Sequence, residues 1–415
     1  MPHAAQADYS NYTQYELRPA TKYDAKKQRF MSQIEVIPVD SRRDRKRFFN
    51  LPWDLYADDP NWIPPIRLVQ KELLNFHKHP FYNTAEVRHF MALKDGVPCG
   101  RVAAIVNHAH NDRYDEKRGF LGFFECIDNQ EAAGKLFDAA REWLGTKGID
   151  QLRGPINPSL NYEVGLLIEG FDDPPWFMMT YNKPYYQRLF EEYGFRKSQD
   201  LAAFWGHVDM LEEITQKFNS LSQTVVERFD LKLRRMDVKN FKYEIETFLD
   251  IYNKSLVSTW GFVPMSDAEV AKQAAGMKQM IIPELTTVAE VDGKPVGTMF
   301  GLLDYNPRIK EIDGKLFPFG FLKLLRNRKG LKKVRLISTN VLPEYQSWGV
   351  GIALVARLVP DALAWGLQEA EFSWVLESNH LSYRTLVKSG AKITKKYRVF
   401  DYGPPDTTVN AKYMP

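Results

Sequence analysis

The chain has 415 residues, with 44% hydrophobic and 26% charged side chains, a composition typical of folded proteins with sizeable cores. Because a domain averages roughly 150 residues, this length predicts two large lobes and excludes a single small module. The net charge of +4 gives no reason to expect a nucleic-acid partner, and two cysteines are too few for a disulfide framework.

Residues 1–30 are polar, rich in tyrosine and without periodicity, which predicts a disordered leader or tag outside the fold. They lack the apolar core of a signal peptide, and no later segment has the roughly 20 uncharged apolar residues that a membrane span needs. We therefore expect a cytoplasmic protein that is soluble or peripheral to the inner membrane.

An internal repeat organises the rest of the chain. Residues 91–100 and 288–297 each form an alternating strand pair joined by an Asp-Gly turn, and the two turns are 197 residues apart. The same spacing separates Tyr186 from Tyr383, each of which lies three residues before a leucine. Landmarks so far apart that keep one offset indicate two copies of one topology.

Each copy is predicted to contain hairpin strands, another strand and a long helix, followed by a strand, a helix and a last strand. The long helix spans about 129–147 in the first copy and 351–368 in the second, where Pro360 kinks or interrupts it. Residues 207–240 are predicted to form a linking helix. We therefore predict an α/β fold of two tandem lobes, each a mixed, mostly antiparallel sheet flanked by helices. The predicted lobes are residues 31–215 and 216–415.

The segment 336–354 carries the clearest chemical feature. A β-rich run breaks at Pro343, and a loop with Gly349 and Gly351 then opens into an apolar helix. Glycines let consecutive backbone N–H groups point into one hollow, where the helix N-terminus adds about half a positive charge. Such an arrangement is suited to binding phosphate groups.

The pattern Gln346-x-x-Gly349-x-Gly351 resembles the pyrophosphate loop of the GNAT acyltransferases. It begins about five residues after the valine of a Val-x-Pro sequence that ends a strand. The chain has neither the Gly-x-x-x-x-Gly-Lys-Ser/Thr nor the Gly-x-Gly-x-x-Gly pattern of nucleotide sites. The resemblance is clear over 285–402, whereas the first lobe has residues 128–134 in place of the loop. It implies one acyl-CoA, or one phosphopantetheine of an acyl carrier protein, held by the second lobe without a metal.

GNAT proteins splay two strands apart, and the resemblance implies that the pantetheine arm lies in this gap. The backbone at Asn340 and Val341 would hold the arm and polarise the thioester carbonyl, and Asn379 would touch the arm. The residues expected around the pyrophosphate are Gln346, Ser347, Trp348, Gly349, Val350 and Gly351.

Attack of an amine on a thioester needs removal of a proton from the amine and an acid for the departing thiolate. Glu377, at the end of the strand beside the gap, is the first base candidate, followed by Glu290 and Asp304. An ordinary strand-end carboxylate is the alternative for Glu377. The family often places the acid, a tyrosine, where this chain has Leu386, whereas Tyr383 lies one helical turn earlier. Tyr383 is therefore the candidate acid, with a packed aromatic side chain as the alternative.

Residues 306–333 form an insertion that has no counterpart in the first copy. From Gly314 to Lys333 it has seven basic and no acidic residues, together with several phenylalanines and leucines. Such a segment suits contact with an anionic membrane surface or a cover over an acyl chain. It equally suits the adenosine phosphates of CoA or an acidic acyl carrier protein, and a solvated loop with a buried aromatic anchor is the plainest alternative.

The first copy has its own long loop, residues 154–175, rich in turn-forming and polar residues. The His-x-His pairs at 77–79 and 108–110 lack a third ligand, so we expect surface histidines there. Asparagine and serine in the long loop would cap turns or grip an amine or hydroxyl-bearing head group. The candidates for the head-group role are Asn157, Ser159, Asn161 and Glu169.

The tandem lobes, the Gly-Pro-Ile-Asn-Pro-Ser loop at 154–159 and the Phe-Pro-Phe-Gly insertion at 317–320 resemble the bacterial ceramide synthase type of GNAT protein. Over most of residues 31–402, that resemblance implies N-acylation of a sphingoid long-chain base, giving a ceramide or 3-oxo-ceramide at the cytoplasmic face of the inner membrane. The alternatives are an acetyltransferase for a small amine or peptide and a non-catalytic acyl-CoA-sensing or membrane-binding module. A tRNA-dependent aminoacyl transferase fits less well, because such enzymes do not need the pyrophosphate loop.

Overall fold

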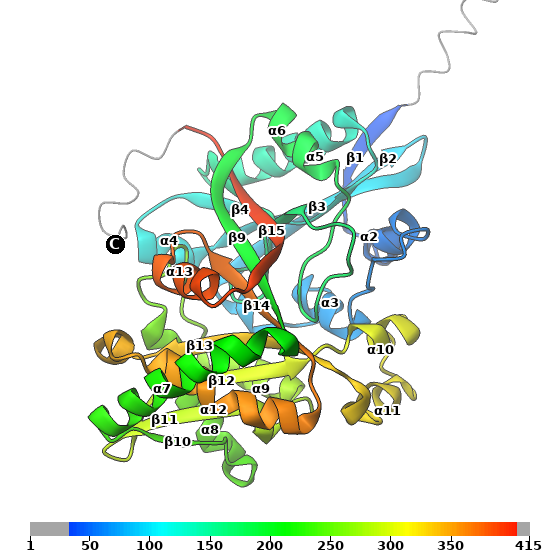
Figure 1. The fold of residues 1–415 in the computed structure, drawn as a ribbon. Coiled ribbons are helices and arrows are strands. Elements are labelled where there is room, and N and C mark those ends of the chain that lie inside the picture. Colours follow the sequence, from blue (N-terminus) through cyan, green and yellow to red (C-terminus); the bar gives the residue numbers. More distant parts are fainter. Residues whose placement is uncertain (1–32, 405–415) are drawn as a thin grey trace, which may run out of the picture.

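The computed structural model describes residues 33–404, apart from the side chains of residues 211–218, so the predicted leader at 1–30 lies outside the described residues (Figure 1). The elements of the first lobe are β1 (Ile34–Pro38), α2 (Arg42–Leu55), α3 (Arg67–Leu73), η2 (Pro80–Asn83), β2 (Ala85–Lys94), β3 (Val97–Asn107), α4 (His108–Tyr114), β4 (Arg118–Cys126), α5 (Gln130–Gly145), β5 (Gln151–Gly154), β6 (Ile156–Asn157), β7 (Glu163–Val164), β8 (Leu166–Glu169), α6 (Tyr186–Tyr193) and β9 (Arg196–His207).

The second lobe follows directly after β9. Its elements are η3 (Val208–Met210), α7 (Leu211–Phe229), β10 (Lys232–Arg234), η4 (Val238–Asn240), α8 (Phe241–Ser255), α9 (Asp267–Met277), η5 (Pro283–Leu285), β11 (Thr286–Val291), β12 (Lys294–Leu303), α10 (Asn306–Glu311), α11 (Gly320–Leu325), η6 (Arg328–Gly330), β13 (Lys333–Val341), η7 (Pro343–Trp348), α12 (Val350–Trp365), β14 (Glu369–Leu376), α13 (His380–Lys388) and β15 (Lys392–Tyr402).

One mixed sheet of thirteen strands runs through the described residues. Its strand order is β1-β2-β3-β4-β5-β15-β9-β14-β13-β12-β11-β10, with β8 added against β15. The parallel pairs are β4 with β5 and β13 with β14, and the other neighbours are antiparallel. This arrangement confirms the predicted α/β class with mostly antiparallel pairing.

The two lobes repeat the same hairpin. In both, the Asp-Gly pair of the turn has positive φ angles, 52° and 81° at Asp95 and Gly96 and 50° and 74° at Asp292 and Gly293. Two successive residues with φ above zero form the type I′ turn, whose twist matches that of the strands on either side. The hairpins are β2–β3 and β11–β12, as the repeat predicts.

The long helices lie close to their predicted bounds. Helix α5 begins after Asn129, whose side chain accepts a hydrogen bond from the Ala132 N–H at 2.8 Å, and α12 begins after Gly349 and contains Pro360. The predicted linking helix over 207–240 is too long. Residue Asp230 takes the left-handed conformation at φ 46° and ends α7, and the chain then enters β10.

The two lobes share strands at the centre of the sheet. The last strand of the chain, β15, lies between β5 and β9 of the first lobe, and β9 pairs in turn with β14 of the second lobe (Figure 1). Phe400 of β15 is fully buried in the core beneath α5 and α6. The Arg153 guanidinium of β5 binds the Asp401 carboxylate of β15 through two contacts of 2.7 Å. Each lobe is therefore completed by a strand from the other. Among the described residues, no helix is both long enough and apolar enough to cross a membrane.

Candidate active site

Strands β13 and β14 separate partway along their length. They pair in parallel over Lys333–Leu336 and Glu369–Phe372, and no pairing between them follows. Beyond that point β13 stays bonded to β12 as far as Val341, and β14 keeps the pairing with β9 that it has on its other edge from Glu369 onward. In Figure 1 the two strands diverge at the junction of the lobes. The edge of β13 that faces β14 is therefore without a strand partner over residues 337–341.

The backbone alternation along β13 determines which amides face this gap. The Leu342 N–H donates to the Val296 carbonyl at 2.9 Å, so the next residue toward the strand, Val341, directs its N–H to the opposite side. The Thr339 N–H has the same orientation. Among the described residues neither amide has a side-chain acceptor, and the Val341 carbonyl accepts from Gln346 Nε2 at 3.1 Å. The gap thus presents backbone donors to a ligand.

The loop after β13 has free amides of the kind that bind phosphate. Gly349 takes φ 84° at the start of α12, and the Ile352 N–H donates back to its carbonyl at 2.9 Å. This leaves the N–H groups of Val350 and Gly351 without a partner among the described residues. Trp348 stacks on Phe229 of α7 at 4.1 Å and so fixes the loop against that helix.

Two buried polar side chains and one half-buried hydroxyl lie beside the gap. Thr298 and Asn340 are cross-strand partners on β12 and β13, with 4% and 2% of their surfaces exposed. The Ser255 hydroxyl, at the end of α8, donates to Asn340 Oδ1 at 3.3 Å. The Asn340 amide nitrogen and the Thr298 hydroxyl are buried and have no hydrogen-bond partner in the described part of the chain. Because buried polar atoms are nearly always hydrogen-bonded in native proteins, these two atoms indicate a site for a ligand or an ordered water.

Thr298 and Ser255 were not identified from the sequence. The Asp-Gly turn predicts the β11–β12 hairpin that contains Thr298, although the pairing of Thr298 with Asn340 depends on the register of β13. Ser255 contacts Asn340 only through the packing of α8, for which the sequence has no local signal.

The corresponding gap of the first lobe is filled by the protein itself. The Asn157 side chain accepts from the Phe123 N–H at 2.5 Å, and the Tyr186 hydroxyl accepts from the Cys126 N–H at 2.9 Å. A side chain at Gly122 would approach the Ile156 carbonyl oxygen to 2.3 Å. The amides of β4 are therefore occupied, so the two lobes differ in whether a ligand can reach the strand edge.

Charged groups stand in the first lobe where the second has Thr298 and Asn340. Arg101 is the cross-strand partner of Glu125, with their charged atoms 3.7 Å apart, and Glu125 also accepts hydrogen bonds from Tyr56 and Tyr186. Burial raises the pKa of Glu125, and Arg101 opposes this shift. The Glu125 carboxylate is thus paired within the protein, although Arg101 Nε is buried without a partner among the described residues.

The predicted acid, Tyr383, lies on α13 with its ring edge-on to Phe204 at 5.1 Å. Its hydroxyl has no hydrogen bond among the described residues, unlike that of its repeat counterpart Tyr186. No side chain of α13 is buried. Asn379 caps this helix, accepting from the Ser382 N–H at 3.1 Å, so its side-chain oxygen is already occupied.

The three base candidates are engaged elsewhere. The Glu377 carboxylate binds Lys197 at 2.8 Å and accepts from the Asp200 N–H at 3.1 Å, and Glu290 binds Arg234 at 2.7 Å. Burial raises the pKa of Asp304 to about 6, and this carboxylate accepts from backbone N–H groups where β12 ends. In the described structure none of the three contacts Asn340 or Val341.

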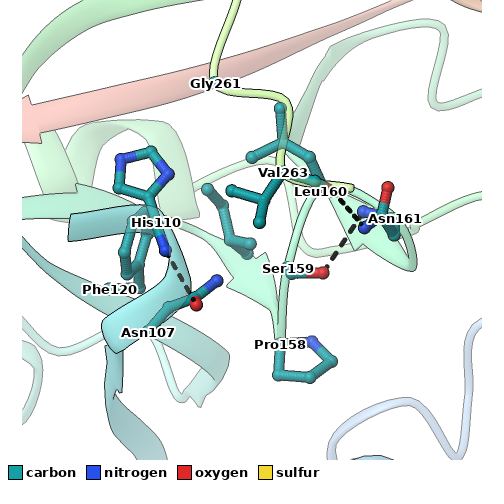
Figure 2. Close-up of a pocket in the computed structure, with 10 residues that line it drawn as sticks. Asn107, His110, Phe120, Pro158, Ser159, Leu160, Asn161, Gly261 and Val263 are labelled. Carbon is teal, nitrogen blue, oxygen red and sulfur yellow. Dashed lines mark hydrogen bonds between the residues drawn. The ribbon is translucent and has the colours of Figure 1, made fainter. Parts of the chain in front are cut away.

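Of the predicted head-group residues, Ser159 and Asn161 lie where the first-lobe loop meets the second lobe (Figure 2). Asn161 donates to the Val263 carbonyl at 2.9 Å and accepts from the Tyr252 hydroxyl at 2.9 Å, so it ties the first-lobe loop to the second lobe. Ser159 lines a cavity of about 10 Å³, roughly the space for one water. Asn157 is bonded to Glu163 as well as to β4, and Glu169 forms an ion pair with Lys396 on the surface.

The histidine pairs are not all on the surface, contrary to the sequence prediction. His79 and His110 are buried, with 4% and 2% exposure, and His110 contacts the Glu116 carboxylate at 2.5 Å. Within the described residues no group of three or more histidine, cysteine, aspartate or glutamate side chains is placed to hold a metal ion.

Comparisons with known proteins agree with this geometry. No protein-family profile matches the chain. It is 33% identical over 380 residues to the Bacterial ceramide synthase of Caulobacter vibrioides, covering 89% of this chain and 97% of that protein. It is 32% identical over 370 residues to Protein YghO of Escherichia coli, covering 87% and 93%.

Solved structures of GCN5-related (GNAT) proteins share the fold. A tandem GNAT protein of clavulanic acid biosynthesis superposes with a TM-score of 0.52 at 11% identity, covering 90% of this chain and all of that chain. The GCN5-related glucosamine N-acetyltransferase region of a fungal β-N-acetylglucosaminidase gives 0.53 at 15% identity, covering 89% and 38%. Fold and site thus define a tandem-lobe GNAT acyltransferase. At the sequence level, the chain belongs to the bacterial ceramide synthase family.

Proposed function

We propose that this enzyme transfers a long-chain acyl group from acyl-CoA, or from an acyl carrier protein, to the amine of a sphingoid long-chain base, giving a ceramide or 3-oxo-ceramide. The observation that carries the proposal is a set of backbone donors without partners among the described residues, the amides of Val341, Val350 and Gly351, on the strand and loop that hold the buried Asn340 and its partner Thr298. The 33% identity to a protein named Bacterial ceramide synthase supports the choice of acceptor.

The bound donor would supply an activated thioester carbonyl. In this proposal the Val350 and Gly351 amides and the helix N-terminus hold its diphosphate, with Gln346, Ser347, Trp348 and Gly349 shaping the loop. The amides of Thr339 and Val341 stabilise the charge that develops on the carbonyl oxygen as the amine attacks.

Thr298 and Asn340 would orient the attacking amine. Because Glu290, Asp304 and Glu377 are held in other contacts, we infer that water removes the proton of the amine. Tyr383, whose hydroxyl is uncommitted among the described residues, would protonate the departing thiolate. The first lobe would contribute through its 154–175 loop, which packs against the segment that follows α8.

We further propose that the enzyme works in the cytoplasm, in peripheral contact with the inner membrane. Its product and its acceptor are both lipids, and the cationic insertion at 314–333 is the segment with the composition for such contact.

The direct test is to incubate the purified protein with palmitoyl-CoA and either sphinganine or its 3-oxo form, and to detect N-acyl products by mass spectrometry. We expect product from at least one base and none from Gly349→Glu, which places a charged side chain in the loop. The control Gly293→Glu has a similar positive φ in open space and should retain activity.

Other outcomes would identify the alternatives. Absence of N-acyl product from any lipid amine would contradict the proposal that the acceptor is a sphingoid base. Preference for acetyl-CoA over palmitoyl-CoA would favour a small-amine or peptide acetyltransferase. Stabilisation by CoA without any turnover would favour a non-catalytic acyl-CoA-sensing protein.

A further inference from the structure

The insertion at 306–333 presents aromatic side chains to solvent. Phe317 and Phe319 are 71% and 69% exposed, and Leu322 and Phe321 on α11 are 55% and 39% exposed. Aliphatic side chains anchor the segment in the core, with Leu324 5% exposed and Ile309, Ile312 and Leu331 also buried. The expected buried aromatic anchor is therefore absent from the described insertion, because the aromatic residues point outward and aliphatic side chains fill the inner positions.

This exposure does not come from a loosely held loop. The Arg308 guanidinium donates to the carbonyls of Leu324 at 3.1 Å and Asn327 at 2.7 Å, closing the insertion from inside. At its stem, Asp313 accepts from Trp53 Nε1 and from the Arg67 guanidinium, both at 2.6 Å. Residues of both lobes thus hold the insertion, and its phenylalanines project from a fixed base.

Positive charge surrounds the exposed aromatics. Lys315 and Lys333 are paired with Asp313 and Glu369. Lys323, Arg326 and Lys332 have no acidic partner among the described residues, and all three are exposed. Exposed phenylalanine and leucine beside unpaired lysine and arginine are the combination that binds anionic lipid headgroups and inserts into the interface below them.

The position along β13 argues against a role in holding the donor's phosphates. The insertion enters β13 at Lys333, and the glycine loop follows its other end after Val341. At about 3.3 Å per residue, the two ends are roughly 25 Å apart. In Figure 1, α10 and α11 lie on the opposite side of the second lobe from α13. The insertion therefore faces away from the expected diphosphate.

We infer that Phe317, Phe319, Phe321 and Leu322, with Lys323 and Arg326, form a rigid docking edge for an anionic lipid bilayer. This inference rests on the proposed function in one respect, because a docking edge would serve to bring the enzyme to its lipid acceptor. It orients the protein with the insertion toward the membrane and the donor's diphosphate toward solvent.

Vesicle co-sedimentation without any substrate tests the docking edge, so the result does not depend on catalysis. We expect binding to phosphatidylcholine vesicles that contain phosphatidylglycerol, weaker binding to phosphatidylcholine alone, and loss of binding in Phe317→Ser/Phe319→Ser/Leu322→Ser. Lys323→Ala/Arg326→Ala should weaken binding to the anionic vesicles by about fivefold per charge removed. The control Val97→Ser removes a side chain that is 64% exposed at the start of β3 in the first lobe and should bind as the wild type does.

The docking edge would be overturned if the wild type does not bind anionic vesicles, or if the triple serine variant binds them normally. It would also be overturned if that variant loses binding only to an acyl carrier protein, which would make the edge a protein interface. Turnover with a short-chain, water-soluble amine separates the two proposals. The triple variant should keep that activity, and its loss with vesicle binding intact would place the edge in the active site instead.

Discussion

The Tyr186 hydroxyl donates a hydrogen bond to the Glu125 carboxylate at 2.8 Å, and this contact closes the strand gap of the first lobe. The repeat places Tyr383 and Asn340 at the equivalent positions of the second lobe, where no such contact forms among the described residues. One fold thus occurs twice in the chain, once closed by its own side chains and once with unpartnered polar groups.

Tyr186→Phe should destabilise the protein without a direct effect on chemistry. The change leaves the Cys126 N–H and one hydrogen-bonding position of Glu125 unpaired in a buried site, which costs about 1–3 kcal/mol. Urea unfolding should show the loss, and the kcat per folded molecule should stay near the wild-type value. A large fall in kcat with unchanged stability would mean that the first lobe takes part in catalysis.

Tyr383→Phe should lower activity without lowering stability, which is the opposite of the effect expected for Tyr186→Phe. Because its hydroxyl has no partner among the described residues, its removal should leave the melting temperature unchanged, while loss of the acid should lower kcat about 100-fold. Steady-state kinetics with Tyr243→Phe as control measures this, since Tyr243 is 46% exposed on α8. Equal activity of the two variants would exclude Tyr383 as the acid.

Thr298→Val should reduce kcat/KM about tenfold while leaving stability unchanged or slightly higher. The hydroxyl is buried without a partner, so its replacement by a methyl group removes a desolvation cost in the free enzyme and a contact in the complex. Thr287→Val is a matched control, because Thr287 is also buried on β11 with an unpartnered hydroxyl. If both variants behave alike, Thr298 has no special role toward the substrate.

The raised pKa of Glu371 predicts that the free energy of unfolding falls as the pH rises. Burial raises the pKa of this carboxyl to about 7, although Arg335 and Ser373 oppose the shift. The folded protein therefore holds a proton that the unfolded chain releases from pH ~4.5 upward, so stability is lost between pH ~4.5 and ~7, by up to about 3 kcal/mol.

Glu371→Gln should remove most of this dependence. Urea unfolding at pH 5 and pH 8 should give a smaller difference for the variant than for the wild type. Asp304, whose pKa is also raised, remains in both proteins, and its charge is one of the smaller causes of the raised Glu371 pKa. An identical pH dependence in the two proteins would show that Glu371 is ionised in the folded state at low pH.

Local patterns in the sequence were sufficient for the features that depend on neighbouring residues. The Asp-Gly turns, the two long helices and the glycine loop before α12 are all encoded within short segments. The exchange of β9 and β15 was beyond such reasoning, because each lobe has an equivalent final strand and the pattern does not say which sheet receives it. Likewise, Glu377 ends its strand as predicted, but only the fold shows Lys197 beside it.

The sequence likewise predicts only part of the set of side chains around the gap. Asn340 was identified through the strand before the loop, whereas its neighbours Thr298 and Ser255 come from other elements. Asn161 has a side chain of the type that could bind a head group, but its amide instead forms hydrogen bonds that join the two lobes.

Calorimetric titration of palmitoyl-CoA into the wild type, Gly349→Glu and Gly293→Glu tests most directly whether the loop before α12 binds the acyl donor. If the amides of Val350 and Gly351 hold the donor's diphosphate, the wild type and Gly293→Glu should bind one equivalent with similar affinity, and Gly349→Glu should lose at least about 100-fold. Undiminished binding by Gly349→Glu, or binding of two equivalents per chain, would contradict the account.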